Sequence, residues 1–329
     1  MEFAMIGLGR MGSNMVRRLV RGGHSAVVYD VDPAQSKALE KEGALSAPSL
    51  TRLLAQVSHP AVLWLMLPAG DVTEQTLREL EPMLQAGDLV IDGGNSHFKD
   101  DVRRAKRLHA RGALYLDAGV SGGVWGLEKG YCLMAGGEKE AFVRAEPLLR
   151  TLAPGPAGIP PSPSRAPGTA EQGYVHCGPA GSGHFVKMVH NGIEYGMMQA
   201  LAEGLELLHE SSRERVPSEH RFDLNLAEIS ETWRRGSVIT SWLLDLAARS
   251  LNQDQDLAQF HGRVEDSGEG RWMLEAAMEA AVPVPALAAA IFTRFRSRES
   301  ESYAEKLLSA MRNGFGGHGE ARLEPDHAA

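Results

Sequence analysis

The sequence has few cysteines, few aromatic residues and no uninterrupted hydrophobic run long enough to cross a membrane. Its two cysteines, Cys132 and Cys177, form neither a C-x-x-C pair nor a zinc-binding pattern, so we expect free thiols. The longest apolar stretch, residues 276–291, is interrupted by a glutamate and two prolines. A basic segment leading into a long apolar one is also absent near the first residue. We therefore expect a cytoplasmic protein with no membrane contact.

An excess of basic residues is missing as well. Lysine and arginine number 34 against 42 aspartates and glutamates, which gives a formal net charge of −8. This balance argues against general affinity for nucleic acid or for an acidic membrane surface. Histidines and carboxylates show no convergent metal-ligand spacing, so we expect no metal. With 329 residues, 43% of them hydrophobic, the chain is long enough for two globular domains.

A glycine-rich turn near the start carries the first functional signal. Residues 2–6 favour a strand, residues 7–12 read Gly-Leu-Gly-Arg-Met-Gly, and a helical pattern continues to about residue 21. A second strand, residues 25–29, ends at Asp30. This arrangement is typical of a dinucleotide site, where the glycines let the backbone approach a pyrophosphate at a helix N-terminus. Asp30 can accept hydrogen bonds from a ribose and would repel a 2′-phosphate, which favours NAD over NADP. Alternatively, Asp30 is only a turn residue.

The alternation of strands and helices predicts the fold. Strand-like runs recur at residues 61–67, 89–91, 113–116, 131–135 and 173–176, with helix-length segments between the earlier ones. We expect an α/β Rossmann-like N-terminal domain, residues 1–178, with a doubly wound, mostly parallel sheet. A proline-rich insertion, about residues 154–172, is expected to be a mobile surface excursion or, less simply, a polyproline ligand. Helical patterns at 185–211, 226–235, 237–251, 270–281 and 285–312 predict an all-α C-terminal domain, residues 179–329.

Small polar residues and glycines cluster where the predicted strands end. These loops are residues 67–70, 92–96 and 117–126, and they offer backbone N–H groups and short donors to a polyol or a carboxylate. Each loop taken alone is also an ordinary turn. The candidate cofactor-binding residues are Gly7, Leu8, Gly9, Arg10, Met11, Gly12, Asp30, Leu67 and Asn95.

The stretch from Gly181 to Gly196 predicts a helix with one polar stripe. Steps of three and four residues align Lys187 with His190, Asn191 and Glu194, while the valines, Ile193 and the other apolar residues fall on another side that we expect to be buried. A lysine and a carboxylate about 10 Å apart along the axis can approach a small substrate from two ends. We interpret them as an acid/base pair, with a structural ion pair as the alternative.

Five motifs together resemble the decarboxylating 6-phosphogluconate dehydrogenases, in a short bacterial form that uses NAD. They are residues 7–12, 92–96, 121–126 (Ser-Gly-Gly-Val-Trp-Gly), 183–196 and 266–272 (Asp-Ser-Gly-Glu-Gly-Arg-Trp). The resemblance implies oxidative decarboxylation of 6-phospho-D-gluconate to D-ribulose 5-phosphate and CO2 with reduction of NAD. In this reading Lys187 is the general base and Glu194 is the acid that protonates the enediol.

The same resemblance assigns the substrate-binding residues. They are Asn95, Ser121, Gly122, Gly123, His190, Asn191, Tyr195 and Arg298, with Tyr195 and Arg298 at the phosphate. The family also implies a homodimer or homotetramer built through the helical domain, and it leaves a role for His318 in the tail open. Two other functions stay possible from the residues: a β-hydroxyacid dehydrogenase acting on another small acid, and a non-catalytic NAD-binding regulatory protein.

Overall fold

The computed structural model describes residues 1–164 and 166–316, and its contacts divide the chain into two compact units, Met1–Asn191 and Gly192–Ala329. The N-terminal unit is built on one eight-stranded sheet of order β3-β2-β1-β4-β5-β6-β7-β8. All neighbouring strands are parallel except β6 and β7. The strands are β1 Glu2–Ile6, β2 Ser25–Tyr29, β3 Leu45–Ser46, β4 Val62–Leu65, β5 Leu89–Asp92, β6 Leu114–Ser121, β7 Cys132–Gly137 and β8 Tyr174–Gly178. The predicted doubly wound, mostly parallel sheet is confirmed.

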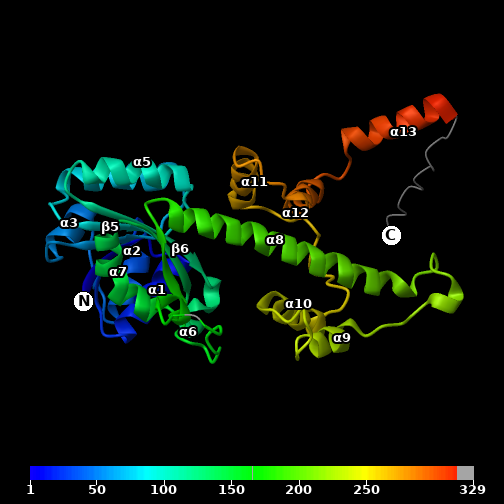
Figure 1. Cartoon of the computed structure of the whole chain (residues 1–329), viewed down its shortest axis with the longest axis horizontal. Helices are drawn as coiled ribbons and strands as arrows, with labels where there is room; N and C mark the ends of the chain where they lie inside the picture. The colour runs from blue at the N-terminus through cyan, green and yellow to red at the C-terminus, as the bar shows by residue number, and fades with distance from the viewer. Residues whose placement is uncertain (165, 317–329) are drawn as a thin grey trace. The chain divides into compact units, whose positions relative to one another are not determined.

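Helices cover both faces of this sheet (Figure 1). One core layer joins it to α1 (Arg10–Arg21), α2 (Pro33–Glu40) and α7 (Lys139–Leu152), and the opposite layer joins it to α3 (Leu50–Ala55), α4 (Asp71–Leu80) and α5 (Phe98–His109). A short helix, α6 (Gly126–Lys129), precedes β7. Central strands buried on both faces need continuous apolar sequences, and β4 reads Val-Leu-Trp-Leu with all four residues buried.

The C-terminal unit is helical within the described residues, as predicted. Helix α8 (Ser182–His209) begins in the N-terminal unit and continues into this one. It is followed by α9 Leu226–Trp233, α10 Trp242–Gln253, α11 Glu269–Glu279, α12 Pro285–Arg296 and α13 Tyr303–Gly316. No helix in residues 1–164 or 166–316 has both the length and the apolar character that a membrane crossing requires.

Three glycines let the first turn of α8 approach the backbone of β6 and β7. A Cβ atom on Gly183 would lie 2.5 Å from the Met134 carbonyl oxygen, and one on Gly119 would lie 2.4 Å from the Cβ of Lys187. A Cβ on Gly136 would lie 2.5 Å from the Gly183 nitrogen. Since real Cβ contacts are never this short, only glycine permits the observed separation. Lys187 can therefore lie against the sheet only because positions 119, 136 and 183 have no side chain.

Some boundaries differ from those expected. The compact units divide after Asn191 rather than at residue 178, because the first turns of α8 pack on β6 and β7. Residues 117–121, predicted as part of a loop, extend β6, since they pair with β7 from Asp117–Gly136 to Ser121–Cys132. The helix predicted over 285–312 is two helices, with a break between Arg296 and Tyr303. The tail residue His318 lies outside the described residues.

The glycine contacts generate a stability prediction. We expect Gly183→Ala to lower the free energy of unfolding by about 1–3 kcal/mol, because the new methyl group has no space against the Met134 carbonyl. Gly204 is the matched control on the same helix, since its Cβ would meet nothing within 4 Å. Gly204→Ala should stabilise the protein by about 0.5–1 kcal/mol. Urea denaturation of both variants is the measurement, and equal effects would contradict the argument.

Candidate active site

A cleft of about 610 Å³ opens at the carboxyl ends of β1, β4 and β5 in the N-terminal unit. The strand order reverses between β1 and β4, which is the switch point where doubly wound sheets bind ligands. Eight of the nine candidate cofactor residues line this cleft: Gly7, Gly9, Arg10, Met11, Gly12, Asp30, Leu67 and Asn95. The ninth, Leu8, is fully buried, and its backbone N–H donates a hydrogen bond to Asp30, which lines the cleft.

The glycines of this cleft have different physical reasons for being glycine. Gly7 has φ +92°, and its Cβ would lie 2.4 Å from the Met66 carbonyl oxygen, so the turn itself requires it. A Cβ on Gly12 would likewise lie 2.1 Å from the Gly7 carbonyl oxygen. A Cβ on Gly9 would meet nothing within 4 Å, and no side chain caps the N-terminus of α1 at this residue. The open space and the uncapped helix end fit an anionic ligand such as a pyrophosphate.

Asp30 closes the cleft at the end of β2. One carboxylate oxygen accepts a hydrogen bond from the Leu8 backbone N–H at 2.6 Å, and the other accepts from the Asp32 N–H at 2.8 Å. These bonds fix the carboxylate beside the glycine-rich turn, and its remaining lone pairs can accept hydrogen bonds from a ribose. Asp30 therefore holds the turn and lines the cleft, and its hydrogen bonds to a ribose stay a prediction.

Sequence reasoning missed several lining residues that lie outside the predicted loops. Among them are Val31, Met66, Val72 and Thr76. Val72 and Thr76 are four residues apart on α4, immediately after the loop at 67–70, so they share the helix face nearest that loop. This spacing could have predicted both residues as part of the cleft, because the sequence places the loop at 67–70 at the end of a strand.

The first turns of α8 bring four predicted site residues together. Lys187 is only 7% exposed, and its Nζ donates a hydrogen bond to the Asn191 side-chain oxygen at 2.6 Å. The His190 ring lies 3.2 Å from the same oxygen through Nδ1 and 3.5 Å from the Ser121 hydroxyl through Nε2. Gly122 and Gly123 follow Ser121 with φ +145° and +53°, so this turn depends on glycine. The result is a buried amine with hydroxyl, imidazole and amide groups nearby, which can bind a polyol and accept a proton.

Asp117 caps the helix that carries this group. Its carboxylate oxygens accept hydrogen bonds from the backbone N–H groups of Gly181, at 2.6 Å, and His184, at 2.8 Å. Burial raises the pKa of Asp117 to about 6. A carboxylate at a helix N-terminus is favoured both by the free N–H groups and by the helix dipole.

A buried charged cluster lies beneath the same helix turn. Asp92, Asp101 and His184 offer possible metal-ligand atoms within 4.8 Å of one another. The Arg104 guanidinium already contacts these acids, with Nη1 2.8 Å from Asp92 and 3.6 Å from Asp101. An arginine and a histidine among the carboxylates supply the balancing charge that a cation would otherwise bring. The expectation of no metal stays a prediction.

The remaining candidates belong to the C-terminal unit. Tyr195 is buried there, and the Arg294 guanidinium lies 3.6 Å from the centre of its ring. Arg298 instead donates to the Asp266 carboxylate at 2.7 Å and to the Val264 carbonyl at 2.9 Å. Glu194 lies seven residues after Lys187 on α8, and it is partly exposed.

The motif at 266–272 supports this arrangement. Asp266 binds Arg271 through both carboxylate oxygens, at 2.9 and 3.0 Å, and also binds Arg298. Its pKa is lowered, because the bonds to these two arginines outweigh the effect of burial. Gly270 passes so close to Ile291 and Tyr195 that a Cβ would lie 2.1 Å and 3.1 Å from their side chains. The motif therefore packs Tyr195 and orders two of the nearby arginines.

Comparison with known proteins gives matches over both units. Residues 2–158 match the family model described as the NAD binding domain of 6-phosphogluconate dehydrogenase, and residues 183–304 and 211–328 match the model of its C-terminal domain. A Haloferax volcanii protein named 6-phosphogluconate dehydrogenase, NAD(+)-dependent, decarboxylating, is 40% identical over 98% of this chain and 100% of its own length. The YqeC protein of Bacillus subtilis is 39% identical over 97% of this chain and 98% of its own.

Solved structures show the same fold. A Plasmodium falciparum 6-phosphogluconate dehydrogenase superimposes with a TM-score of 0.77 at 24% identity, covering 99% of this chain and 67% of that one. A Mycobacterium tuberculosis 3-hydroxyisobutyrate dehydrogenase gives a TM-score of 0.64 at 22% identity, covering 94% and 99%.

Proposed function

The chain belongs to the 6-phosphogluconate dehydrogenase family, and from that premise we propose that it converts 6-phospho-D-gluconate and NAD to D-ribulose 5-phosphate, CO2 and NADH. The observation that carries this proposal is the buried Lys187 amine, hydrogen-bonded to Asn191 in the unit that also contains the dinucleotide cleft. The full-length relative named as NAD-dependent and decarboxylating supports the same reaction.

NAD, when bound, supplies the hydride acceptor. The open face of Gly9, the N-terminus of α1 and the Asp30 carboxylate fit its pyrophosphate and ribose. Asp30 would repel a 2′-phosphate, so the proposal favours NAD over NADP. Leu67 and Asn95 line the same cleft near the sheet edge.

Lys187 and Glu194 divide the proton transfers. Neutral Lys187 takes the proton of the C3 hydroxyl as hydride leaves C3, which gives a β-keto acid. Cleavage of the C1–C2 bond then releases CO2 and leaves the electron pair in an enediol, whose oxygen receives the proton from Lys187. Glu194 protonates C2 to form the product. Ser121, Gly122, Gly123, His190, Asn191 and Asn95 hold the sugar acid in this proposal.

Two arginines are candidates for the substrate phosphate. The sequence suggests Arg298, but its guanidinium is occupied by Asp266 and the Val264 carbonyl. Arg294 stacks on Tyr195, the residue that the resemblance assigns to the phosphate. The Nη1 of Arg294 donates to the Glu265 carbonyl at 2.9 Å, but among the described residues this arginine pairs with no carboxylate, so its charge and its other N–H groups are suited to an oxyanion. We therefore extend the proposal from Arg298 to Arg294.

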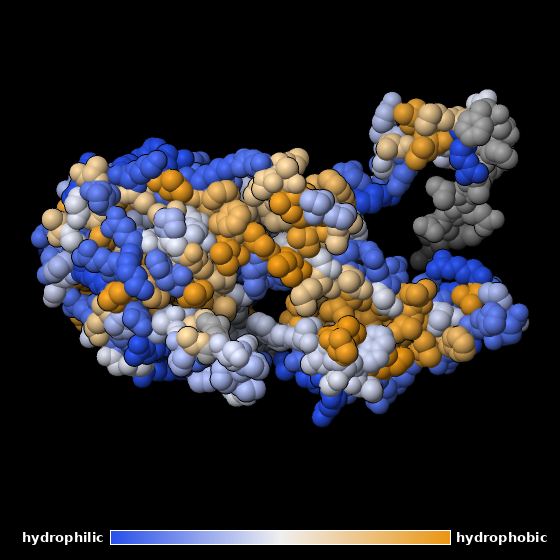
Figure 2. All heavy atoms as spheres, in the orientation of Figure 1, coloured by the Kyte–Doolittle hydropathy of each residue, from blue (hydrophilic) through white to orange (hydrophobic). Residues whose placement is uncertain are grey.

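The C-terminal unit is proposed to pair with a second copy of the chain. Few of its hydrophobic side chains are buried among the described residues: Tyr195, Leu226, Leu244, Ala248, Leu251, Met273, Ala290 and Ile291. Large apolar residues remain on its surface, including Leu207 at 74% and Phe260 at 62% exposed, and Figure 2 shows hydrophobic side chains gathered over this unit. A unit of this size usually buries far more apolar surface by itself. Association with another chain would bury this surface, and most soluble oligomers are symmetric assemblies of identical chains.

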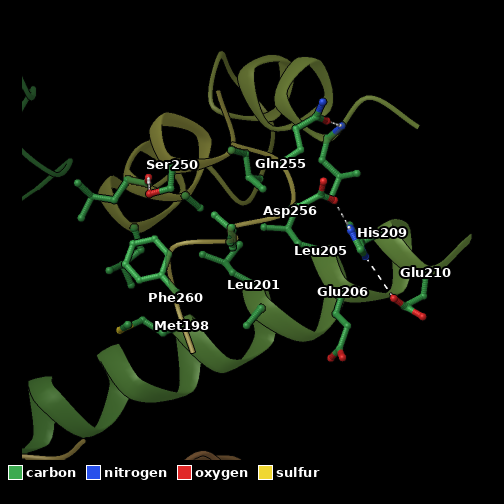
Figure 3. Close-up of a pocket in the computed structure, with 17 residues that line it drawn as sticks. Met198, Leu201, Leu205, Glu206, His209, Glu210, Ser250, Gln255, Asp256 and Phe260 are labelled. Carbon is green, nitrogen blue, oxygen red and sulfur yellow. Dashed lines mark hydrogen bonds and ion pairs between the residues drawn. The ribbon is translucent and has the colours of Figure 1, made fainter. Parts of the chain in front are cut away.

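A groove on this unit is the surface most suited to that contact. It is a cavity of about 530 Å³ lined mainly by apolar residues of α8, α10 and the segment after α10. Figure 3 shows Met198, Leu201 and Leu205 of α8 on one wall, with His209 bonded to Asp256 and Glu210 at one end. Val186 and Ile193, which the sequence predicted to be buried, are 39% and 49% exposed on α8, and Met197 is 43% exposed. A second copy would cover them.

The other functions are less well supported. A β-hydroxyacid dehydrogenase would use the same lysine without a phosphate site, and an NAD-binding regulator would need neither Lys187 nor Glu194. Both residues are present, and the relative matched over its whole length is named as decarboxylating. The two free cysteines fit a reducing compartment, so a cytoplasmic location stays part of the proposal.

Turnover is the direct test. We expect NADH absorbance and CO2 release when protein, 6-phosphogluconate and NAD are mixed, with a lower kcat/KM for NADP. Glu194→Gln should reduce kcat by about 10²–10⁴-fold, because a general acid is lost, while the variant still binds 6-phosphogluconate. Asp30→Ala should bring the kcat/KM for NADP closer to the kcat/KM for NAD. Absence of turnover with either cofactor would refute the proposed reaction.

The phosphate site is tested by comparing two matched variants. We expect Arg294→Ala to raise the KM for 6-phosphogluconate by about tenfold or more, since a charged hydrogen bond is lost. Arg298→Ala should mainly lower stability, because it leaves Asp266 with one arginine fewer. If Arg298→Ala raised the KM more than Arg294→Ala, the result would contradict this assignment and favour Arg298 as the phosphate-binding residue.

The association state can be measured independently of activity. We expect sedimentation velocity to give a dimer or a tetramer, and Leu205→Glu in the groove to shift the protein towards monomers, since a buried charge opposes association. Val238→Glu is the control, because Val238 is fully exposed and outside the groove. A monomeric wild-type protein would contradict the proposed pairing.

A further inference from the structure

His184 occupies the first turn of α8, three residues before Lys187. Its side chain is almost completely buried, at 2% exposed, and its Nδ1 lies 2.7 Å from the Asp101 carboxylate. Its backbone N–H donates to Asp117, so the residue is held at both its main chain and its ring. Residues three apart on a helix lie on the same side, which places His184 one turn below the proposed base.

Asp101 connects His184 to a wider buried network. The Tyr115 hydroxyl donates to Asp101 at 2.7 Å, and Arg104 binds Asp92 at 2.8 Å. Asp92 accepts hydrogen bonds from the Gly94 N–H and the Ser96 hydroxyl, on either side of Asn95. One network therefore supports both the turn that carries Lys187 and the loop that carries Asn95.

Three carboxylates, Asp92, Asp101 and Asp117, lie around His184, so Arg104 and a protonated His184 each offset one negative charge in this network. Burial disfavours the charged imidazole, but the carboxylates of Asp101, Asp92 and Asp117 together outweigh this effect and raise the pKa of His184 to about 10. The charged or titratable groups around it are Asp92 on β5, Asp101 and Arg104 on α5, and Tyr115 and Asp117 on β6. Loss of the imidazolium would leave Asp101 as a buried carboxylate with less compensation, which is costly in a low-dielectric interior.

We propose that His184, held by Asp101, is a positioning residue that fixes the first turn of α8 and thereby the place of the Lys187 amine beside Asn191. The inference rests on the proposed function, because it takes Lys187 as the base. The glycine contacts make the coupling rigid: Gly183 and Gly119 leave no space between this turn and the sheet. A shift of the His184 turn must therefore move Lys187, and displacement of a catalytic group by about 1 Å can cost about 10²-fold in rate.

The chain offers a matched control. His59 and Asp88 form a second histidine–aspartate pair, with Nδ1 2.8 Å from a fully buried carboxylate. Asp88 precedes β5 and His59 precedes β4, so this pair lies at the amino ends of the strands, opposite to the cleft. His184→Gln and His59→Gln thus remove the same kind of interaction at two ends of one sheet.

Steady-state kinetics with separate cofactor binding distinguish a positioning role from a general loss of structure. We expect His184→Gln to lower kcat by about tenfold or more. The KM for 6-phosphogluconate and the Kd for NADH, measured by fluorescence titration, should both stay within about twofold of the wild-type values. His59→Gln should leave all three within about twofold. A folded His184→Gln protein with wild-type kcat, or one whose NADH affinity falls in proportion to kcat, would overturn the proposal.

A double variant covers the case in which His184→Gln does not fold. His184→Gln with Asp101→Asn keeps a neutral hydrogen-bonding pair and removes both charges, so the uncompensated carboxylate disappears. Compared with His59→Gln, its kcat should again be lowered by several-fold. An equal kcat in the two proteins would contradict the role of His184.

Chemical labelling separates failure of this inference from failure of the proposed reaction. Trinitrobenzenesulfonate modifies accessible neutral amines, and mass spectrometry can follow Lys187 without any substrate. We expect Lys187 to be labelled several-fold faster in His184→Gln than in wild type or His59→Gln, since it would leave its buried place beside Asn191. Unchanged labelling would overturn the inference, whereas absent turnover in the wild type refutes only the reaction.

Discussion

The close contact between the first turn of α8 and strands β6 and β7 is the constraint on which the rest of the site depends. Side chains at Gly119, Gly136 or Gly183 would collide with backbone or with Lys187 at 2.4–2.5 Å. Asp117, in the middle of β6, meets the helix end at the same place through two backbone N–H groups. Steric fit and capping therefore act together, and both fix where the Lys187 side chain begins.

Burying Lys187 at this contact has an electrostatic consequence. The amine lies in a unit whose interior already contains Asp92, Asp101 and Asp117, and unpaired charges there would be costly. Arg104 and His184 place positive charge among these carboxylates. Their hydrogen bonds, with that of Tyr115, connect α5, β5 and β6 to α8. The same bonds that lower the cost of burial also give the site its rigidity.

The sequence predicted those parts of the fold that local chemistry determines. The fingerprint at 7–12 and the doubly wound sheet follow from glycine geometry and from hydrophobic periodicity. The burial predicted for the apolar side of α8 was wrong, since Val186 and Ile193 are 39% and 49% exposed. The extension of β6 through Ser121 could not be read locally, because its glycine-containing sequence resembles a loop until the antiparallel partner β7 is in place. The ionic cluster was equally hidden, since Asp101 and His184 are 83 residues apart and meet only in the folded chain.

The arginines of α12 mark where sequence spacing stops being decisive. Arg294 and Arg298 are four residues apart, so they lie on one side of the helix and its end, and periodicity gives no reason to choose between them. Arg296 points elsewhere and pairs with Glu305. The choice comes instead from what each guanidinium already binds: a carboxylate neutralises Arg298, whereas the ring of Tyr195 leaves the charge of Arg294 uncompensated by that contact. A phosphate gains more from an arginine without an anionic partner, because no existing ion pair has to be broken first.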